Sequence, residues 1–281
     1  MTYYKGSEHR LSSSPFFSII TCTFNAANYL HEHIASVEAQ KLQDFEHVFV
    51  DAYSTDGTLE IIKEYQLRHP GRVRLEQRPA KGISDAMNAG VRYARGRVVV
   101  HLHSDDYLAS SQVLCRVYEI FSEIDTKIVV GNCRLIGQGP DNYTWPQNMI
   151  KRRLMTALIR SMMFYTNLIP HPSLYIEREV FLNYGGFDEA YRVAMDYDLW
   201  FRMLRYETFT FTDQILSTYR FHADTVSTKQ MELGLVEITH IRKMYRRHYP
   251  IAYAIFIFCI LPLFIIRRML KRSSAQAAAK V

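Results

Sequence analysis

Short apolar runs alternate with helical stretches in the N-terminal part of the chain, and this alternation constrains the fold most strongly. Four runs have the length and the β-branched and aromatic content of buried strands, at 17–24, 45–51, 73–77 and 97–103. Helical patterns separate them, at about 29–40 after a turn and helix cap at 25–28, and at 60–68 and 84–95. Strands separated by helices of about ten to fifteen residues pair in parallel through right-handed crossovers. The sequence predicts an α/β fold with a mixed, mainly parallel sheet flanked by helices.

Composition agrees with a folded chain and excludes several protein classes. The 281 residues are 48% hydrophobic and 22% charged, enough for one large domain and an accessory segment. Disordered, collagen-like and disulfide-stapled proteins have other compositions. The four cysteines lie far apart without C-x-x-C spacing, so we expect a reducing compartment and no zinc site. Residues 1–15 are polar, and we expect a flexible N-terminus without a secretion signal.

Positive charge is concentrated near the C-terminus. Eight Lys and Arg residues, and no acidic residue, fall between Arg242 and Arg272. Because the net charge of the whole chain is +6, the remainder carries −2. This distribution argues against a nucleic-acid-binding face on the main body, so nucleic acid is not an expected partner.

An uncharged apolar segment, 251–266, lies between the basic clusters. As a helix it would extend about 24 Å, which is less than a bilayer core of about 30 Å, and Pro262 would kink it. Tyr249, Tyr253 and the basic flanks are typical of a membrane interface. We expect 226–281 to form a C-terminal helical segment that attaches the protein to the cytoplasmic face of the cell (inner) membrane. It would be a short span or an interfacial helix, and a buried core helix is the alternative.

Polar residues stand at the ends of three predicted strands: Asn25, Asp51 and the pair Asp105–Asp106. In a parallel sheet these ends share one edge, where ligands bind. The sequence contains no G-x-G-x-x-G after the first strand and no G-x-x-x-x-G-K-[ST], which disfavours dinucleotide and P-loop chemistry. A carboxylate-lined cleft can hold a diphosphate if Mg²⁺ or Mn²⁺ lies between them. Each aspartate alone could instead cap a turn or helix.

Five ordered motifs resemble a known family. They are T-F-N at 23–25, D-A-Y-S-T-D-G-T at 51–58, K-G-I-S-D-A-M-N at 81–88, L-H-S-D-D at 102–106 and A-M-D-Y-D-L-W-F-R at 194–202. Together they are similar to the motifs of the family-2 inverting glycosyltransferases, whose catalytic domain has the GT-A fold. The resemblance covers about 17–222 and implies a GT-A domain over 16–225.

The resemblance implies a nucleotide-sugar donor at the strand ends. Thr23 and Asp51 would contact the base and ribose, with Asn25 in the same substrate-binding turn and Lys81 lining the nucleotide pocket. Tyr53 stands where the family usually has glycine. Its ring would stack on the nucleobase or merely cover the turn.

The resemblance also implies a metal site and a catalytic base. Asp106 would hold Mn²⁺ or Mg²⁺, with Asp105 on the ribose side or sharing the metal. His103 replaces a commoner Asp or Asn and would ligate the metal or pack beside it. Asp196 would be the general base that deprotonates the acceptor hydroxyl. Its position at a helix start is expected to keep it ionised.

Three further features complete the predicted site. Arg202 belongs with the substrate-side motif, although its spacing from Asp198 favours a structural ion pair. His222 resembles a late His or Arg that approaches the diphosphate in some members. The chain lacks the Q-x-x-R-W motif of processive synthases, which favours a single-addition enzyme.

A basic amphipathic pattern covers 149–169. This segment would pack on the sheet or lie on anionic lipid near a lipid-linked acceptor. His171, just after it, would touch the sugar or cap a turn.

The leading hypothesis is a membrane-associated, metal-dependent, inverting glycosyltransferase. It would transfer one sugar to a lipid-linked, lipopolysaccharide-type or exopolysaccharide-type glycan. The alternative is a catalytically inactive nucleotide-sugar-binding subunit of a membrane glycan-assembly complex. A sugar nucleotidyltransferase is disfavoured because no Gly-rich phosphate loop follows the first strand.

Overall fold

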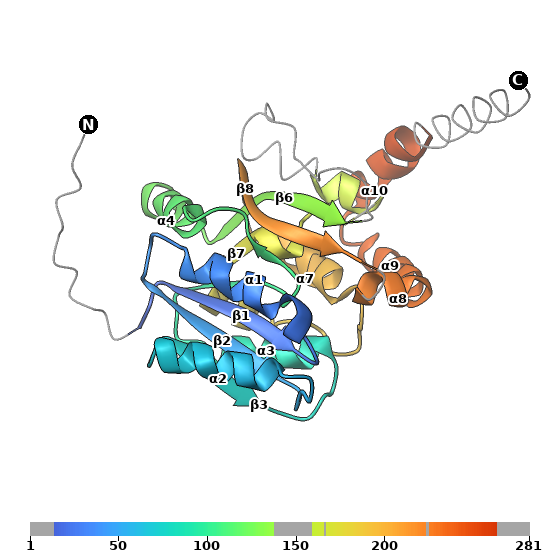
Figure 1. Cartoon of the computed structure of the whole chain (residues 1–281). Helices are drawn as coiled ribbons and strands as arrows, with labels where there is room; N and C mark the ends of the chain where they lie inside the picture. Colours follow the sequence, from blue (N-terminus) through green and yellow to red (C-terminus); the bar gives the residue numbers. More distant parts are fainter. Residues whose placement is uncertain (1–13, 138–158, 166, 223–224, 263–281) are drawn as a thin grey trace, which may run out of the picture.

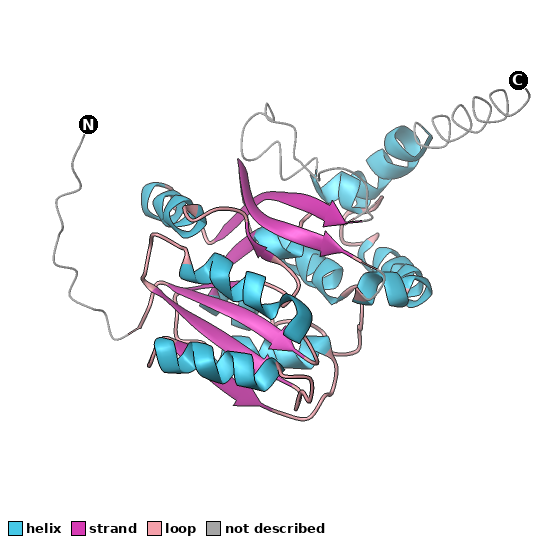
Figure 2. Cartoon of the chain, viewed as in Figure 1, coloured by secondary structure: helices cyan, strands magenta, loops and turns pink. Residues whose placement is uncertain are grey.

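A computed structural model describes residues 14–137, 159–165, 167–222 and 225–262. In this part of the chain, eight strands form one mixed sheet with helices on both faces (Figures 1 and 2). The predicted flexible N-terminus lies largely outside the described residues, and the boundary predicted at 225/226 stays a prediction.

The first half contains the parallel part of the sheet. Its elements in chain order are β1 (Phe17–Thr23), α1 (Ala27–Glu38), β2 (Phe45–Asp51), α2 (Thr58–Arg68), β3 (Val73–Gln77), α3 (Ile83–Tyr93) and β4 (Val98–His101). β1 pairs in parallel with both β2 and β4, and β2 pairs in parallel with β3. The predicted elements are confirmed to within a few residues. The prediction succeeds for β1, β2 and β4 because these strands are buried on both faces and therefore appear as short apolar runs.

The second half completes the sheet with pairings that join distant segments. Its elements are β5 (Tyr107–Leu108), α4 (Val113–Glu123), β6 (Ile128–Gly137), η1 (His171–Ser173), β7 (Leu174–Glu177), α6 (Arg178–Asn183), α7 (Met195–Leu204) and β8 (Thr210–Phe221). The strand order is β3-β2-β1-β4-β7-β6-β8-β5. β7 is antiparallel to β4 and β6, whereas β8 is parallel to β6 and antiparallel to β5.

Alternating side chains of the strands face two helical layers. On one face, Ile20 and Val50 join a core with Met87 of α3 and Trp200 of α7. On the other face, the strands pack against α1, α2 and α4 in two smaller clusters. The sheet is therefore covered on both sides, and its carboxyl edge remains available for a site.

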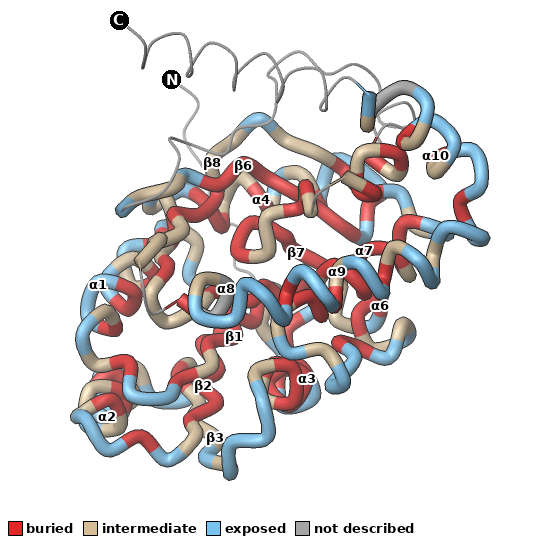
Figure 3. Tube along the Cα trace, turned by 90° about the vertical axis from the view of Figure 1, so that its right-hand side faces the viewer, coloured by how far each residue is buried: buried red, intermediate tan, exposed pale blue. Residues whose placement is uncertain are grey.

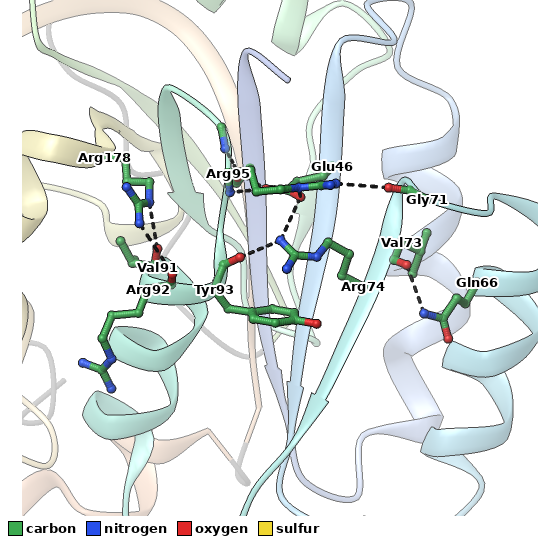
Figure 4. A network of polar contacts seen from close by, with 12 residues as sticks. Glu46, Gln66, Gly71, Val73, Arg74, Val91, Arg92, Tyr93, Arg95 and Arg178 are labelled. Atoms are coloured by element: carbon green, nitrogen blue, oxygen red, sulfur yellow. Dashed lines mark hydrogen bonds and ion pairs between the residues drawn. The ribbon is translucent and has the colours of Figure 1, made fainter. Parts of the chain in front are cut away.

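Glu46 is a buried acid at the start of β2, with a side chain that is 1% exposed. Its carboxylate accepts from the Ser18 hydroxyl at 2.6 Å. It also accepts from the Arg95 Nε at 2.9 Å, and the Arg74 guanidinium lies 3.2 Å away (Figure 4). Burial raises the pKa of Glu46, but these donors outweigh it and hold the pKa below its ordinary value. The network joins β2, β3 and the end of α3 at the edge opposite the strand ends that carry the predicted site.

The C-terminal region packs against α7, in the helical layer that also contains α3. Its elements are α8 (Val226–Lys229), α9 (Met231–Tyr245), α10 (Pro250–Ile255) and the π-helical turn η2 (Phe256–Ile260). Figure 3 shows α9 running along the outside of the molecule, close to α7. None of the described helices is both long and apolar enough to cross a membrane. Residues 263–266 of the predicted apolar segment lie outside the described residues.

Only part of the predicted amphipathic segment 149–169 can be compared, because 149–158 and 166 lie outside the described residues. Residues 159–163 are helical, and Ile159, Met163 and Phe164 are buried in the main core. Of the two predicted arrangements, the described part of this segment therefore shows packing in the core beside the sheet.

Candidate active site

The carboxyl ends of β1 and β2 meet as predicted. Thr23 and Asp51 are paired across the two strands, and the Thr23 hydroxyl donates to Asp51 Oδ1 at 2.7 Å. The Ser54 hydroxyl donates to the same oxygen at 2.6 Å, and the Ser54 N–H donates to Asp51 Oδ2 at 2.9 Å. Asp51 is fully buried. Its carboxylate therefore stabilises the turn after β2. Capping a turn was the alternative role given above for each aspartate.

Asn25 and Tyr53 flank this turn in the left-handed backbone region, with φ values of 52° and 58°. Asn25 Oδ1 accepts from the Thr55 N–H at 2.9 Å, so Asn25 joins the two strand-end loops. The Tyr53 side chain is 54% exposed. Positive φ is rare for a bulky residue, and strained positions of this kind concentrate at functional sites. The Tyr53 ring is therefore open to solvent beside the ends of β1 and β2.

The turn after β4 separates its two aspartates. Asp106 is fully buried; its Oδ1 accepts from the Arg220 N–H at 3.0 Å, and its Oδ2 has no partner among the described residues. Burial, with the charge of Asp105, raises the pKa of Asp106 well above its ordinary value. Asp105 is partly exposed, and its Oδ2 lies 3.0 Å from His222 Nε2. Asp105 lines the cleft described below, whereas the Asp106 carboxylate is buried behind it, so the role of Asp106 in metal binding stays a prediction.

Two residues that sequence reasoning missed hold this turn. Besides its backbone bond to Asp106, Arg220 donates from Nε to the Asp105 carbonyl oxygen at 3.2 Å. His33 of α1 donates from Nδ1 to the Asp106 carbonyl oxygen at 2.8 Å, and its Nε2 lies 3.0 Å from the Thr21 hydroxyl. Burial lowers the pKa of His33 to about 4, so the ring is neutral at pH 7. No local motif marks either residue.

Asp196 lies in the first turn of α7. Its Oδ2 accepts from Asn167 Nδ2 at 2.9 Å, and its Oδ1 accepts from the Tyr197 N–H at 2.6 Å. Burial raises the pKa of Asp196 to about 6, and these hydrogen bonds offset it only in part. The helix start was expected to keep this carboxyl ionised, and with a pKa of about 6 it is mostly ionised at neutral pH, although burial raises the pKa above its ordinary value. A carboxyl that titrates near neutral pH suits a general base.

A cleft of about 200 Å³ brings two of the predicted regions together. Asp105 and His103 reach it from the turn after β4, and Asp196 reaches it from the start of α7. The other lining residues are Ile83, His171, Arg192, Val193, Met195, Tyr219 and Thr225.

An adjoining cavity of about 150 Å³ shares Ile83 and Arg192 with this cleft and is lined by Lys81. The remaining predicted residues do not line either cavity: Thr23, Asn25, Asp51, Tyr53, Asp106, Arg202 and His222.

His171 lies in the cleft rather than only capping its turn. Its ring centroid is 5.3 Å from that of His103 and 6.0 Å from that of Trp200. Burial, with the neighbouring imidazoles, lowers the pKa of His171 well below its ordinary value, so the ring is neutral. Its Nε2 has no hydrogen-bond partner among the described residues. This nitrogen is free to meet a ligand hydroxyl.

Arg202 is a structural residue. Its Nε donates to Asp198 Oδ2 at 2.8 Å, which confirms the predicted ion pair. Its two terminal nitrogens donate to the carbonyl oxygens of Tyr184 and Gly186. The guanidinium is thus occupied within the fold, and the structure gives its predicted role in substrate binding no geometric support.

Glu237 of α9 anchors the loop that leads to Asp196. Its side chain is buried, and its carboxylate accepts from three consecutive backbone N–H groups. The Arg192 N–H donates to Oε1 at 2.9 Å, and those of Val193 and Ala194 donate to Oε2 at 2.9 and 2.8 Å. The loop therefore enters α7 in a fixed orientation. Sequence reasoning missed Glu237 because it lies in a helix outside the recognised motifs.

Comparison with protein-family models agrees with this geometry. The model described as Glycosyl transferase family 2 matches residues 18–185, more than half of the chain. The chain belongs to this family.

Curated relatives of this family-2 chain differ in length. The hyaluronan synthase of Pasteurella multocida is 29% identical over 239 residues, which are 83% of this chain and 23% of that protein. A PGL/p-HBAD biosynthesis glycosyltransferase of Mycobacterium bovis is 28% identical over 241 residues, which are 85% of this chain and 86% of that protein. The chain thus spans less than a quarter of the Pasteurella synthase.

A solved structure confirms the GT-A-like fold of this family-2 chain. The mannosyltransferase PcManGT from Pyrobaculum calidifontis, determined in complex with GDP-Man and Mn²⁺, superposes with a TM-score of 0.63 at 18% identity. The match covers 88% of this chain and 70% of that one.

Proposed function

We propose that this family-2 chain is an inverting glycosyltransferase that moves one sugar from a nucleotide-sugar donor to a glycan acceptor. One observation carries the proposal: Asp105, in the turn after β4, and Asp196, at the start of α7, line the same cleft. Asp196 accepts the proton of the acceptor hydroxyl as that oxygen attacks the anomeric carbon. Asp105 stands on the side where the nucleoside diphosphate departs. The pKa of Asp196, about 6, leaves it mostly ionised and still basic at neutral pH.

Mg²⁺ or Mn²⁺ is the proposed cofactor, as in solved relatives that bind Mn²⁺. Asp105 fits such an ion because its carboxylate faces the cleft, where His103 also lies, and His222 Nε2 is 3.0 Å from its Oδ2. The described residues contain no ready group of three or more ligands, so donor phosphates would complete the shell. Asp106 holds the turn instead of facing the ion. When bound, the ion neutralises charge on the leaving diphosphate.

The donor nucleotide is proposed to bind over the ends of β1 and β2. Thr23, Asn25 and Asp51 form a hydrogen-bonded frame there. Tyr53 and Phe24 stand beside it with 54% and 64% of their surface exposed, so either ring can cover a nucleobase. Lys81 lies farther along, in the cavity next to the cleft, where its charge suits a phosphate group.

The acceptor is proposed to be a lipid-linked, lipopolysaccharide-type or exopolysaccharide-type glycan at the cytoplasmic face of the cell membrane. The relative named hyaluronan synthase supports a glycan acceptor. The basic, apolar C-terminal segment supports attachment to a membrane. The lack of a Q-x-x-R-W motif supports transfer of one sugar at a time.

Donor hydrolysis tests the proposal without knowledge of the acceptor. The purified chain is incubated with Mn²⁺ and a panel of UDP-, GDP- and dTDP-sugars, and release of nucleoside diphosphate is measured. Release from one donor that needs metal and is lost in Asp196→Asn supports the proposal. Asp213→Asn, an exposed acid on β8, is the matched control. Nucleotide binding in a thermal-shift assay with no turnover, even when glycolipid acceptors are added, would favour a catalytically inactive binding subunit.

A further inference from the structure

The helical stretch formed by α10 and η2 has two apolar faces, and the inner one is already occupied by protein. Tyr249, Ala252 and Phe256 follow helical spacing and are each at most 9% exposed. They belong to the same core as Phe164 and Phe201.

Specific contacts fix this inner face. The Tyr249 hydroxyl donates to the carbonyl oxygen of Phe201, in the C-terminal half of α7, at 2.5 Å. The ring centroid of Phe164 lies 6.2 Å from that of Phe256 and 5.3 Å from that of Tyr253. A transmembrane helix must expose its circumference to lipid or to other spanning segments. α10 cannot do so without leaving this core.

The outer face of the same stretch is apolar and uncovered in the described part of the chain. Ile251, Ile255 and Phe258 recur at helical spacing and are 76%, 41% and 78% exposed. Large exposed apolar side chains gathered in this way mark an interaction surface.

Charge identifies the partner. Lys243, Arg246 and Arg247 are exposed immediately before the outer face, and no acidic residue lies between Arg242 and Arg272. A basic cluster that adjoins an exposed apolar stripe matches the boundary between anionic headgroups and acyl chains.

We infer that α10 and η2 lie in the plane of an anionic membrane, with Ile251, Ile255 and Phe258 inserted among the acyl chains and the inner face retained on the protein. The inference deepens the membrane attachment proposed above and does not depend on transfer activity. It also orients the active site, because Glu237 and Tyr245 of the adjoining α9 contact the loop before Asp196 and the Asp198 carboxylate. The acceptor side of the cleft is thereby tied to the membrane-bound helices.

Tryptophan quenching by brominated lipids tests this arrangement, because a spanning helix over 251–266 would place Phe258 near the bilayer centre. Phe258→Trp is mixed with anionic vesicles whose lipids carry bromine either near the headgroup or near the end of the chain. The signal of Trp145 and Trp200 is subtracted by using the unsubstituted protein. We expect stronger quenching by the shallow bromines. Stronger quenching by the deep bromines, or none above background, overturns the inference.

Two controls make the result specific. Leu67→Trp, on α2 at the opposite end of the molecule from α10 (Figure 1), is 81% exposed and should show no added quenching. Reversing the charges with Arg246→Glu and Arg247→Glu should lower partitioning into anionic vesicles by about tenfold or more, since each basic residue near the surface strengthens binding measurably. Unchanged partitioning overturns the electrostatic part of the inference. Donor hydrolysis by the same variants in detergent shows separately whether the proposed enzymatic function holds.

Discussion

Replacing Glu237 by alanine should loosen the loop that carries the proposed catalytic base. Three backbone N–H groups lose their shared acceptor, at distances of 2.8–2.9 Å. A hydrogen bond to a charged group contributes about 1.5–3 kcal/mol, whereas a buried donor left without a partner costs about 1–3 kcal/mol. Arg192 is exposed and Ala194 is buried, so water can compensate fully only at the first of the three. We expect a loss of about 2–4 kcal/mol in the free energy of unfolding.

The catalytic consequence follows from the position of the loop. Ala194 is the N-cap of α7, and Asp196 lies in the first turn. A displacement of about 1 Å in a catalytic group can lower the rate about 100-fold. We therefore expect kcat to fall much more than the KM for the donor rises, because the proposed donor site lies on other strands. Glu237→Gln keeps one carbonyl acceptor and should lose roughly half as much stability.

Urea unfolding and steady-state transfer kinetics measure these effects. Glu232→Ala is the matched control, because Glu232 lies on the same helix but is exposed. The reasoning is refuted if Glu237→Ala unfolds at the same urea concentration as the control and retains its kcat. A variant that is destabilised yet keeps a normal kcat would limit Glu237 to a structural role.

Three further substitutions test individual residues of the site. The transfer rate should rise with pH to a plateau above about pH 6, because burial raises the pKa of Asp196 to about 6 and only the carboxylate accepts a proton; Asp196→Asn should abolish both transfer and this pH dependence. Asp105→Asn should weaken Mn²⁺ activation about tenfold or more in a metal titration, and an unchanged metal response would remove Asp105 from the proposed metal site. Arg202→Ala should lower the free energy of unfolding by about 2–4 kcal/mol because it leaves the buried Asp198 carboxylate without its cation. A raised donor KM in stable Arg202→Ala protein would instead restore the substrate-binding role.

The sequence alone determined the parallel half of the sheet and the regions that carry the site. Strands β1, β2 and β4 could be predicted because a strand buried on both faces leaves a local apolar run. The helices between the strands could be predicted from their own local pattern of apolar residues. Asp51, Asp105 and Asp196 stood out because the motifs hold them at fixed places relative to these elements. Because parallel strands end at the same edge of a sheet, the sequence could place Asp51 and Asp105 at that edge, but it gave no position for Asp196 relative to them.

Tertiary structure decided which atoms face the cleft. Asp106 is turned inward by the Arg220 N–H, a contact between residues 114 positions apart. Glu237 reaches Ala194 across 43 positions. Such contacts depend on how elements that are far apart in the sequence pack together, and the local pattern of apolar residues does not indicate this packing. Helix α10 is a second example. Its sequence is apolar on all sides, so the sequence does not show which side is buried. Its packing against Phe164 and Phe201 identifies the buried side and leaves the other side exposed for the proposed membrane contact.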